Sequence, residues 1–481
     1  MIHYRPVLNI LSALLVFLAA ALAVPTFVSF LYEQTDLNAF LITIGVSLGI
    51  GIPSFFLTRS KEELQIRDGF IVVSFGWFIF ALVGALPFVL SGFIPSYTDA
   101  FFETMSGFTT TGASILTNIE ALPHGLLFWR SFTHWLGGMG IILLSLAILP
   151  LLGVGGMQLF KAEVPGPTPD KLSPRIKHTA ELLWGVYLLI TVLEILALKL
   201  AGMNWFDSMC HTFGTMATGG FSTKNASVGA YNSPTIDAII ILFMIIAGTN
   251  FALHYRALRG KPLIYWKDPE ATFFVIVIAL ATLIIGFDVW ERNGNDAFRA
   301  GQHALFQVVS IITTTGYGTA DYEQWAASSK IVLFILMFIG GCAGSTGGGM
   351  KVIRSLILVK FGRNELKRLI HPQAVLPVRV GDMVVSRDIL TNISGFFLLY
   401  VTIFVLGIIF MGALGLDFES AFGSVAATLN NIGPGLGSVG PTENYAHIPD
   451  LGKWFLSFLM LAGRLEVYTV LVLFTVSFWK R

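Results

Sequence analysis

The chain reads Thr313-Thr314-Thr315-Gly316-Tyr317-Gly318 in its third quarter, and three similar segments accompany it. They are Thr109-Thr110-Thr111-Gly112, Met216-Ala217-Thr218-Gly219-Gly220 and Leu429-Asn430-Asn431-Ile432-Gly433-Pro434-Gly435. Each follows a short apolar stretch, and the four recur at intervals of roughly one hundred residues. This repeat predicts four backbone-lined loops that meet on one axis. Rings of backbone carbonyls replace the hydration shell of an alkali cation, and glycine can turn its carbonyl inward because it tolerates a positive φ.

Composition places the chain in a membrane. Of its 481 residues, 54% are hydrophobic and only 12% are charged, against about 25% charged in an ordinary soluble domain. The formal net charge of +1 indicates no nucleic-acid partner. The two cysteines, Cys210 and Cys342, lie in apolar or glycine-rich stretches and argue against a disulfide framework.

Ten windows approach the ~20 apolar residues that cross a bilayer as a helix. They are 7–31, 37–58, 69–91, 126–153, 178–201, 234–256, 270–289, 329–359, 388–414 and 451–477. The first window lacks a small-residue cleavage site and another span follows it at once, so we interpret it as a retained helix rather than a signal peptide.

A shorter apolar segment lies between the third and fourth spans, and likewise between the fifth and sixth, the seventh and eighth, and the ninth and tenth. The four segments are 98–111, 205–217, 301–314 and 418–430. None is long enough to cross, and irregular backbone at membrane depth is tolerated only inside protein or beside a watery cavity. Amphipathic surface helices are the alternative. Four segments in register favour re-entrant half-helices that end in the glycine segments.

The distribution of Lys and Arg predicts the topology. With the N-terminus inside, most basic residues fall in cytoplasmic loops, as in the run Lys360, Arg363, Lys367 and Arg368. The first outer loop carries Glu33 and Asp36 instead. We therefore expect a multi-pass protein with both termini in the cytoplasm.

The four loops are the candidate cation site. A helix C-terminus carries about half a negative charge and favours a cation. Uncharged oxygens suit a monovalent cation better than calcium or magnesium. Thr315-Gly316-Tyr317-Gly318 is closest to the TVGYG pattern of potassium channels. The carbonyls expected to form the ring belong to Thr111, Gly112, Thr218, Gly219, Thr315, Gly316, Ile432 and Gly433.

The eighth span contains Gly340-Gly341-Cys342-Ala343-Gly344-Ser345-Thr346-Gly347-Gly348-Gly349. Glycine costs a helix about 1 kcal/mol at each position, so the span should break there. Broken helices at this depth line a cavity or move, and we expect a gate below the ring, with Gly340, Gly344, Gly347, Gly348 and Gly349 as its principal glycines. Close helix packing through glycine is the alternative.

Arg464 lies in the last span, where a charge costs at least ~2.5 kcal/mol on insertion scales and is usually functional. It could restrict cation flux or hold the glycine-rich loop through carbonyl hydrogen bonds. The alternatives are an ion pair with Glu466 or a side chain that reaches the inner surface.

The sequence shows no enzyme site and no site for an organic cofactor. Lys351 follows the glycine-rich stretch, but Met350 separates it from the preceding glycine, which breaks the phosphate-loop pattern. The histidines have no metal-ligand spacing with carboxylates or cysteines.

Over nearly its whole length, the chain resembles the TrkH-type potassium uptake proteins of the Trk/Ktr/HKT superfamily. The specific segments are the stretch from Gly340 to Gly349 with Met350-Lys351-Val352-Ile353-Arg354, Ala427-Thr428-Leu429-Asn430-Asn431-Ile432-Gly433-Pro434-Gly435-Leu436-Gly437, Gly463-Arg464-Leu465-Glu466-Val467, and Leu152-Gly153-Val154-Gly155-Gly156-Met157-Gln158-Leu159.

The resemblance implies an all-α membrane protein in which an N-terminal helix pair precedes four helix–loop–helix repeats around a pseudo-tetrameric pore. Its filter glycines map onto Gly112, Gly219, Gly316 and Gly433, its gate onto Gly340–Gly349, and its gate-facing arginine onto Arg464. The corresponding regions are 1–66 for the helix pair, then 67–176, 177–268, 269–384 and 385–481 for the repeats.

The resemblance also implies potassium as the transported ion, the bacterial inner membrane as the location, and a homodimer. Its cytosolic face would bind TrkA-type subunits that sense NAD(H) and ATP or ADP, and the basic stretch 360–368 is a candidate docking surface. A secondary transporter that couples potassium to protons or sodium is the alternative, with Glu181, Glu194 and Glu466 as the candidate coupling carboxylates.

Overall fold

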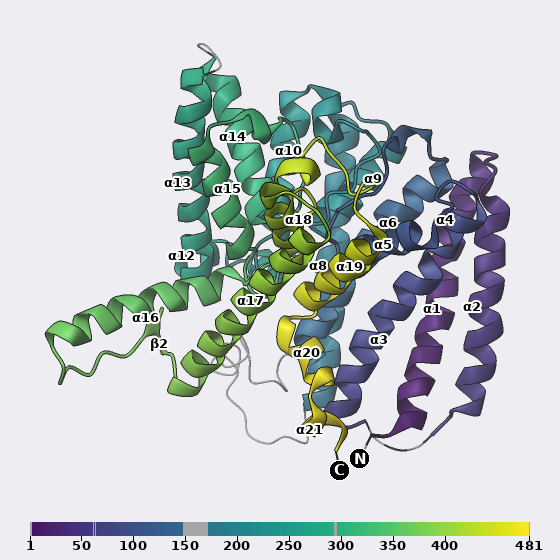
Figure 1. The fold of residues 1–481 in the computed structure, drawn as a ribbon, viewed down its shortest axis with the longest axis horizontal. Coiled ribbons are helices and arrows are strands. Elements are labelled where there is room, and N and C mark those ends of the chain that lie inside the picture. Colours follow the sequence, from purple (N-terminus) through teal and green to yellow (C-terminus); the bar gives the residue numbers. More distant parts are fainter. Residues whose placement is uncertain (1, 61, 63, 148–171, 293–295, 481) are drawn as a thin grey trace.

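The computed structural model describes the chain except for residues 1, 61, 63, 148–171, 293–295 and 481 (Figure 1). The motif Leu152–Leu159 lies outside the described residues. Helices dominate, and the two termini lie at the same end of the molecule (Figure 1).

The chain begins with two long antiparallel helices, α1 (Tyr4–Leu31) and α2 (Leu37–Leu57), which pack along each other. Helix α1 also packs on the first repeat. The buried Asp36 carboxylate joins the two parts, because its Oδ2 accepts the Leu126 N–H at 2.9 Å. The helix pair is therefore anchored to the body that follows.

Four helical units follow, and each places a short helix between longer ones. Unit 1 contains α3 (Ile66–Gly84), α4 (Leu86–Leu90), α5 (Tyr97–Phe108) and α6 (His124–Ala147). Unit 2 contains α8 (Leu172–Leu200), α9 (Trp205–Met216), α10 (Pro234–Ala247) and α11 (Phe251–Leu258), and α12 (Ile264–Lys267) links it to the next unit. Unit 3 contains α13 (Pro269–Arg292), α14 (Ala297–Ile312), α15 (Ala327–Ile339) and α16 (Val352–Ile370).

Unit 4 contains α17 (Arg387–Ala413), α18 (Phe418–Asn430), α19 (Asp450–Arg464), α20 (Val467–Leu471) and α21 (Val476–Trp479). A two-stranded antiparallel hairpin, β1 (Arg379–Val380) and β2 (Met383–Val384), precedes it, with Arg379 opposite Val384. Short 3₁₀ turns lie at Ile119–Ala121, Ser227–Tyr231, Tyr322–Gln324, Gly437–Val439 and Val472–Phe474.

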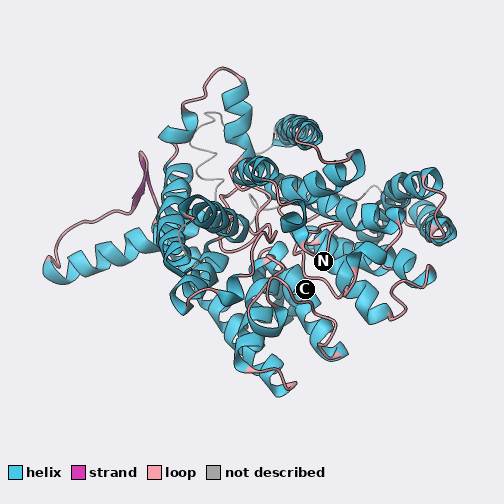
Figure 2. Ribbon diagram, turned by 90° about the horizontal axis from the view of Figure 1, so that it is seen from above, coloured by secondary structure: helices cyan, strands magenta, loops and turns pink. Residues whose placement is uncertain are grey.

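The short helices α5, α9, α14 and α18 arrange the four units in a closed ring. Each packs on the next helix of its own unit, in the pairs α5–α6, α9–α10, α14–α15 and α18–α19. Each also packs on a helix of the preceding unit, in the pairs α6–α9, α10–α14, α15–α18 and α19–α5. Since the last pair returns to unit 1, the ring closes, and Figure 2 shows the loops surrounded by helices.

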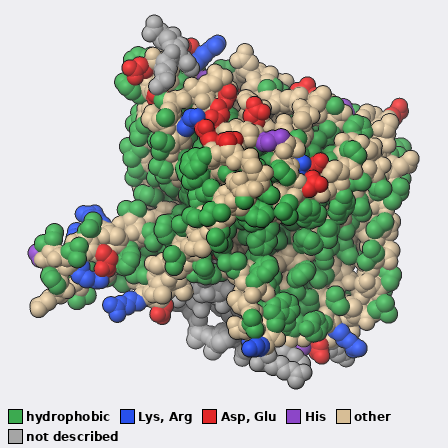
Figure 3. All heavy atoms as spheres, in the orientation of Figure 1, with side chains coloured by type: hydrophobic (Ala, Val, Ile, Leu, Met, Phe, Trp, Pro, Cys, Tyr) green, Lys and Arg blue, Asp and Glu red, His purple; other side chains and the backbone are tan. Residues whose placement is uncertain are grey.

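The helix lengths fit a membrane-spanning protein. Among the described residues, six helices are long and apolar enough to cross a bilayer: Tyr4–Leu31, Leu37–Leu57, Arg67–Leu90, His178–Leu200, Pro269–Glu291 and Arg387–Ala413. Hydrophobic side chains cover most of the middle of the face in Figure 3, whereas charged side chains lie mainly along its edges. These helices confirm six of the ten expected spans.

Two expected spans, 234–256 and 451–477, are not single helices. The first bends by 102° between α10 and α11, and the second bends by 117° between α19 and α20. At the first bend Asn250 caps α11 by accepting the Ala252 N–H at 2.9 Å, which starts a new helix. At the second bend Glu466 has φ of 61°, which a continuous helix does not allow.

The expected break in the eighth span is confirmed. Helix α15 ends at Ile339 and α16 begins at Val352, so the stretch 340–351 is non-helical. Beyond its first turns, α16 leaves the body of the molecule as an arm (Figure 1). A small apolar cluster, which includes Ile353 and Ile357 of α16 and Val378 and Val380 near the hairpin, holds the base of this arm.

Candidate functional site

Each of the four short helices begins at a polar side chain that caps it. The cap oxygen accepts a backbone N–H three residues later, which satisfies the free donors of the first turn. The pairs of cap and donor are Ser96 and Asp99, Asn204 and Asp207, Asp296 and Arg299, and Asp417 and Ser420. The partly negative C-terminal ends of the helices then lead directly into the four glycine segments.

The four short helices also end in the same hydrogen-bonded turn. In unit 3, the Thr314 N–H donates to Ile311 O at 3.0 Å and the Thr315 N–H donates to Ser310 O at 2.8 Å. These bonds define a Schellman motif, whose residue after the helix is left-handed. The equivalent bonds elsewhere are Thr110–Gly107 and Thr111–Ser106, Thr218–Thr215 and Gly219–Gly214, and Asn431–Thr428 and Ile432–Ala427.

The left-handed residue of each loop is threonine or asparagine rather than the glycine that usually occupies this position. The four residues are Thr110, Thr218, Thr314 and Asn431, with φ of 51°, 53°, 61° and 55°. A positive φ is rare for a β-branched residue such as threonine. Strained backbone of this sort persists only where the surrounding structure fixes it, and it is concentrated at functional sites.

A second positive φ follows two residues later in each loop, always at glycine. The four glycines are Gly112, Gly220, Gly316 and Gly433, with φ of 82°, 79°, 81° and 91°. Without a Cβ, glycine adopts this conformation at little cost. All four loops therefore share one backbone pattern, although their sequences differ.

The expected register of the second loop needs a correction. The sequence mapping gave Gly219 as its filter glycine, but both the Schellman bonds and the positive φ place Gly220 opposite Gly112, Gly316 and Gly433. Gly219 instead corresponds to Thr111, Thr315 and Ile432. It is glycine for another reason: a Cβ there would overlap the ring of His134, which stacks on Phe221.

The four loops form a circle in which each loop contacts the next one along the chain and the fourth contacts the first. A Cβ added to each glycine would collide with a backbone oxygen of the next loop, closer than real Cβ atoms approach. The pairs are Gly112 with Gly219 O, Gly220 with Thr315 O, Gly316 with Ile432 O, and Gly433 with Thr111 O. Unit 4 thus contacts unit 1, and the carbonyls of Thr111, Gly219, Thr315 and Ile432 are equivalent members of one ring.

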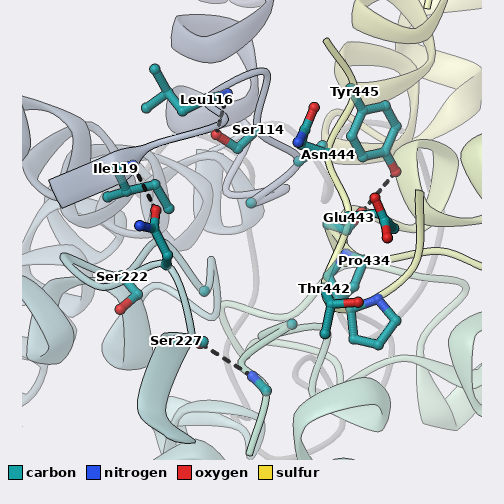
Figure 4. A pocket seen from close by; sticks show the side chains of 18 of the residues that line it. Ser114, Leu116, Ile119, Ser222, Ser227, Pro434, Thr442, Glu443, Asn444 and Tyr445 are labelled. Carbon is teal, nitrogen blue, oxygen red and sulfur yellow. Dashed lines mark hydrogen bonds between the residues drawn. The ribbon is translucent and has the colours of Figure 1, made fainter. Parts of the chain in front are cut away.

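One cavity opens onto the ring. Gly112, Gly220, Gly316 and Gly433 all line it, together with the segments that lead away from the loops. In Figure 4, Ser114 and Leu116 of unit 1 face Asn444 and Tyr445 of unit 4 across this mouth. The ring is therefore accessible from one side.

Buried polar contacts fix the segments around the mouth. The Glu103 carboxylate on α5 accepts Arg130 Nε at 2.6 Å and the Ile115 N–H at 2.9 Å, and an Arg130 NH donates to Ser222 O at 2.9 Å. This pair joins units 1 and 2. Tyr445 joins unit 4 to unit 1, because its hydroxyl donates to Gly433 O at 2.7 Å and its N–H donates to Ser114 O at 2.8 Å.

The glycine-rich loop, Gly340–Gly349, lies against three of the four glycine segments. Thr314 Oγ1 accepts the Gly348 N–H at 2.6 Å, and the Thr346 hydroxyl donates to Met216 O at 2.9 Å. A Cβ at Gly348 would collide with Asn430 O. The loop therefore contacts the C-terminal ends of the short helices of units 2, 3 and 4.

The backbone of this loop explains part of its glycine content. Gly340, Gly344 and Gly349 have φ of 74°, 74° and 71°. A Cβ at Gly347 would lie 3.0 Å from Thr313 O, so this glycine allows close approach instead. The loop is too tightly folded against the ring for larger residues at these positions.

Arg464 joins this loop to unit 1. Its side chain is buried, and its guanidinium donates to Thr346 O at 2.7 Å and to Gly137 O at 3.1 Å. Of the two alternatives, the pair with Glu466 is wrong, because Glu466 pairs with Arg354 at 2.5 Å. A side chain that reaches the inner surface is excluded by its burial, so the expected carbonyl contacts are present.

Several residues of the site were missed from the sequence. Gly220 was missed because two adjacent glycines allow two alignments of the second loop with the others. Glu103 and Arg130 were missed because they lie on two different helices and the sequence does not show their contact. Among the described residues, no group of three or more His, Cys, Asp and Glu side chains could hold a metal ion. The polar side chains of the four glycine segments are hydroxyls and the amides of Asn430 and Asn431, and none of them is charged.

Comparisons with known proteins show which sequences and which solved structure this chain resembles. The model of the TrkH family, described as a cation transport protein, matches residues 37–480. The Trk system potassium uptake protein TrkH of Escherichia coli K12 is 46% identical over 99% of this chain and 100% of that protein. TrkG of the same organism is 35% identical over 99% of both chains. The crystal structure of the potassium transporter TrkH from Vibrio parahaemolyticus has a TM-score of 0.92 at 41% identity and covers both chains fully.

Proposed function

Since this chain belongs to the TrkH family of cation transport proteins, we propose that it carries potassium ions through the ring of four glycine loops. The chain is a multi-pass membrane protein, and its relatives are named as transport proteins rather than enzymes. Relatives of nearly the same length are named potassium uptake proteins, which supports potassium as the transported ion. We place the protein in the bacterial inner membrane with both termini in the cytoplasm.

The observation that carries this proposal is the closed circle of equivalent loops. Four backbones with one pattern of positive φ approach one another so closely that no side chain fits between adjacent loops. Their carbonyls supply uncharged oxygen ligands, which substitute for the water around an alkali cation. The proposed ligands are the carbonyls of Thr111, Gly112, Gly219, Gly220, Thr315, Gly316, Ile432 and Gly433, with Thr218 at the entrance to the second loop.

The glycine-rich loop and Arg464 form the proposed gate. The loop lies directly beneath the ring, and Arg464 holds it through Thr346 O while it also contacts Gly137 O of unit 1. A fixed guanidinium at this depth raises the barrier for a passing cation, and its tether keeps the loop across the axis. Displacement of the loop would remove both obstacles together.

We further propose a homodimer whose cytosolic face binds TrkA-type subunits that sense NAD(H) and ATP or ADP. The relatives are named as parts of a Trk system. Helix α16 supports a docking role because it projects from the body and carries exposed Lys367, Arg368, Leu369 and Ile370 (Figure 1). The chain itself shows no nucleotide-binding motif in its sequence, which suits a separate sensing subunit.

A flux assay on the purified chain in liposomes tests the pore. We expect passive Rb⁺ and K⁺ uptake that exceeds Na⁺ uptake, and Gly316→Ala should abolish it or admit Na⁺ because the new Cβ collides with Ile432 O. Gly301→Ala is the matched control, since Gly301 lies near the N-terminal end of α14, away from the loop, and no atom lies within 4 Å of its added Cβ. Equal effects of the two variants would refute the four-loop pore.

One observation favours coupled transport as a second candidate. The Glu194 side chain on α8 is fully buried, and neither carboxylate oxygen has a hydrogen-bond partner among the described residues. Buried carboxylates at membrane depth mark proton or ion pathways. Flux that requires a proton gradient, and that Glu194→Gln makes independent of the gradient, would favour a coupled transporter over a passive pore.

A further inference from the structure

Glu270 contacts the glycine-rich loop from below. It lies in the first turn of α13, and its Oε1 accepts two backbone N–H groups from outside its own helix. One belongs to Ala343, inside the glycine-rich loop, at 2.7 Å. The other belongs to Ile353, in the first turn of α16, at 3.0 Å. A single oxygen thus bridges the loop and the helix that follows it.

Both N–H groups need such an acceptor. The first N–H groups of a helix have no partner within the helix, and the Ile353 N–H is one of them. The Ala343 N–H lies in irregular backbone. Glu270 itself is 8% exposed, so water supplies little alternative solvation. A buried N–H group left without an acceptor is costly, which makes the Glu270 oxygen an effective anchor.

A second carboxylate holds the same turn of α16. Arg354 pairs with Glu466 at 2.5 Å, and its guanidinium lies 4.3 Å from the centre of the Phe396 ring. Glu466 lies at the bend of the last membrane segment, directly after the turn that carries Arg464. The base of α16 is therefore held from units 3 and 4, whereas its distal part projects as an exposed arm (Figure 1).

We infer that Glu270 is a positioning residue that latches the glycine-rich loop to the base of the α16 arm. The inference rests on the proposed gating function and deepens it. Because one oxygen holds both N–H groups, movement of the arm that withdraws Ile353 from α13 also disturbs the contact with Ala343. A movement of the exposed arm, for example when a partner binds it, would therefore also move the loop beneath the ring.

The test combines flux with hydrogen exchange on the full chain in lipid. Glu270→Ala should increase exchange of backbone amides in peptides that cover 340–355 by roughly tenfold, since an acceptor is lost from each of two N–H groups, and it should raise basal Rb⁺ flux. Glu270→Gln keeps an acceptor oxygen and should restore most of the protection. Asp268→Ala is the matched control, because Asp268 lies two positions before Glu270 and, among the described residues, its carboxylate accepts the Ala271 N–H of its own helix end, at 2.8 Å, and no N–H of the loop.

The outcomes separate the latch from the gate. Unchanged exchange in Glu270→Ala, or equal exchange in Asp268→Ala, overturns the latch. The latch is also overturned if Glu270→Ala increases exchange but leaves flux unchanged while Arg464→Met raises flux, because the loop then gates without Glu270. If neither variant raises flux although exchange increases, the gating function itself fails. Increased exchange and flux in Glu270→Ala, with rescue by Glu270→Gln, supports the latch.

Discussion

Replacement of Arg464 by methionine should open the pore. The guanidinium makes two hydrogen bonds, to Thr346 O and Gly137 O, and bonds from charged donors contribute about 1.5–3 kcal/mol each. Removal of a buried charge also relieves its desolvation cost, which offsets much of that loss. A net destabilisation of the closed loop by about 2 kcal/mol corresponds to a roughly thirtyfold rise in the open-to-closed ratio.

The assay is Rb⁺ uptake by proteoliposomes that contain the chain alone, with K⁺ and Na⁺ compared in parallel. Arg464→Lys separates the two roles of the residue, because lysine keeps the charge but lacks the planar fork that reaches two carbonyls. If the tether dominates, Arg464→Lys should approach the flux of Arg464→Met. If only the charge matters, it should match the native protein. Native flux in Arg464→Met would refute the reasoning altogether.

Two further predictions concern the ring itself. Gly219→Ala should impair potassium flux because its Cβ collides with the His134 ring, and adding His134→Ala should restore the flux. Adding His134→Ala to Gly220→Ala should not restore it, because that Cβ meets the Thr315 backbone oxygen. Flux in the two single and two double variants checks the corrected register, and restored flux in both double variants would contradict it. Tyr445→Phe removes one hydrogen bond to a ring carbonyl, about 1 kcal/mol, and should raise the Na⁺-to-K⁺ flux ratio; an unchanged ratio would show that this contact does not shape the filter.

Much of this arrangement could be predicted from the sequence because it is encoded locally. The four short helices follow from polar caps, apolar stretches of limited length and terminal glycines. The break in the third unit follows from six glycines in ten residues, since such a stretch cannot remain helical. The contact of Arg464 with loop carbonyls was also expected, because an arginine buried in a membrane needs acceptors.

The parts that were not predicted depend on residues distant in the sequence. The choice between Gly219 and Gly220 is made by the His134 ring on another helix. The bend after Arg464 places Glu466 beside Arg354, which lies 112 positions earlier. Glu270 and Ala343 are likewise 73 positions apart. Local patterns report the conformation of a segment, whereas these contacts depend on how the four units close into a ring.

That closure also explains how a single gate could serve four units. The loops of the ring are equivalent in backbone, yet within the described part of the chain the glycine-rich break occurs in unit 3 alone. This loop reaches the short helices of units 2, 3 and 4 through Met216 O, Thr314 Oγ1 and Asn430 O. Arg464 completes the circle by joining it to Gly137 of unit 1. A loop that contacts three units directly, and the fourth through Arg464, needs no symmetric copies.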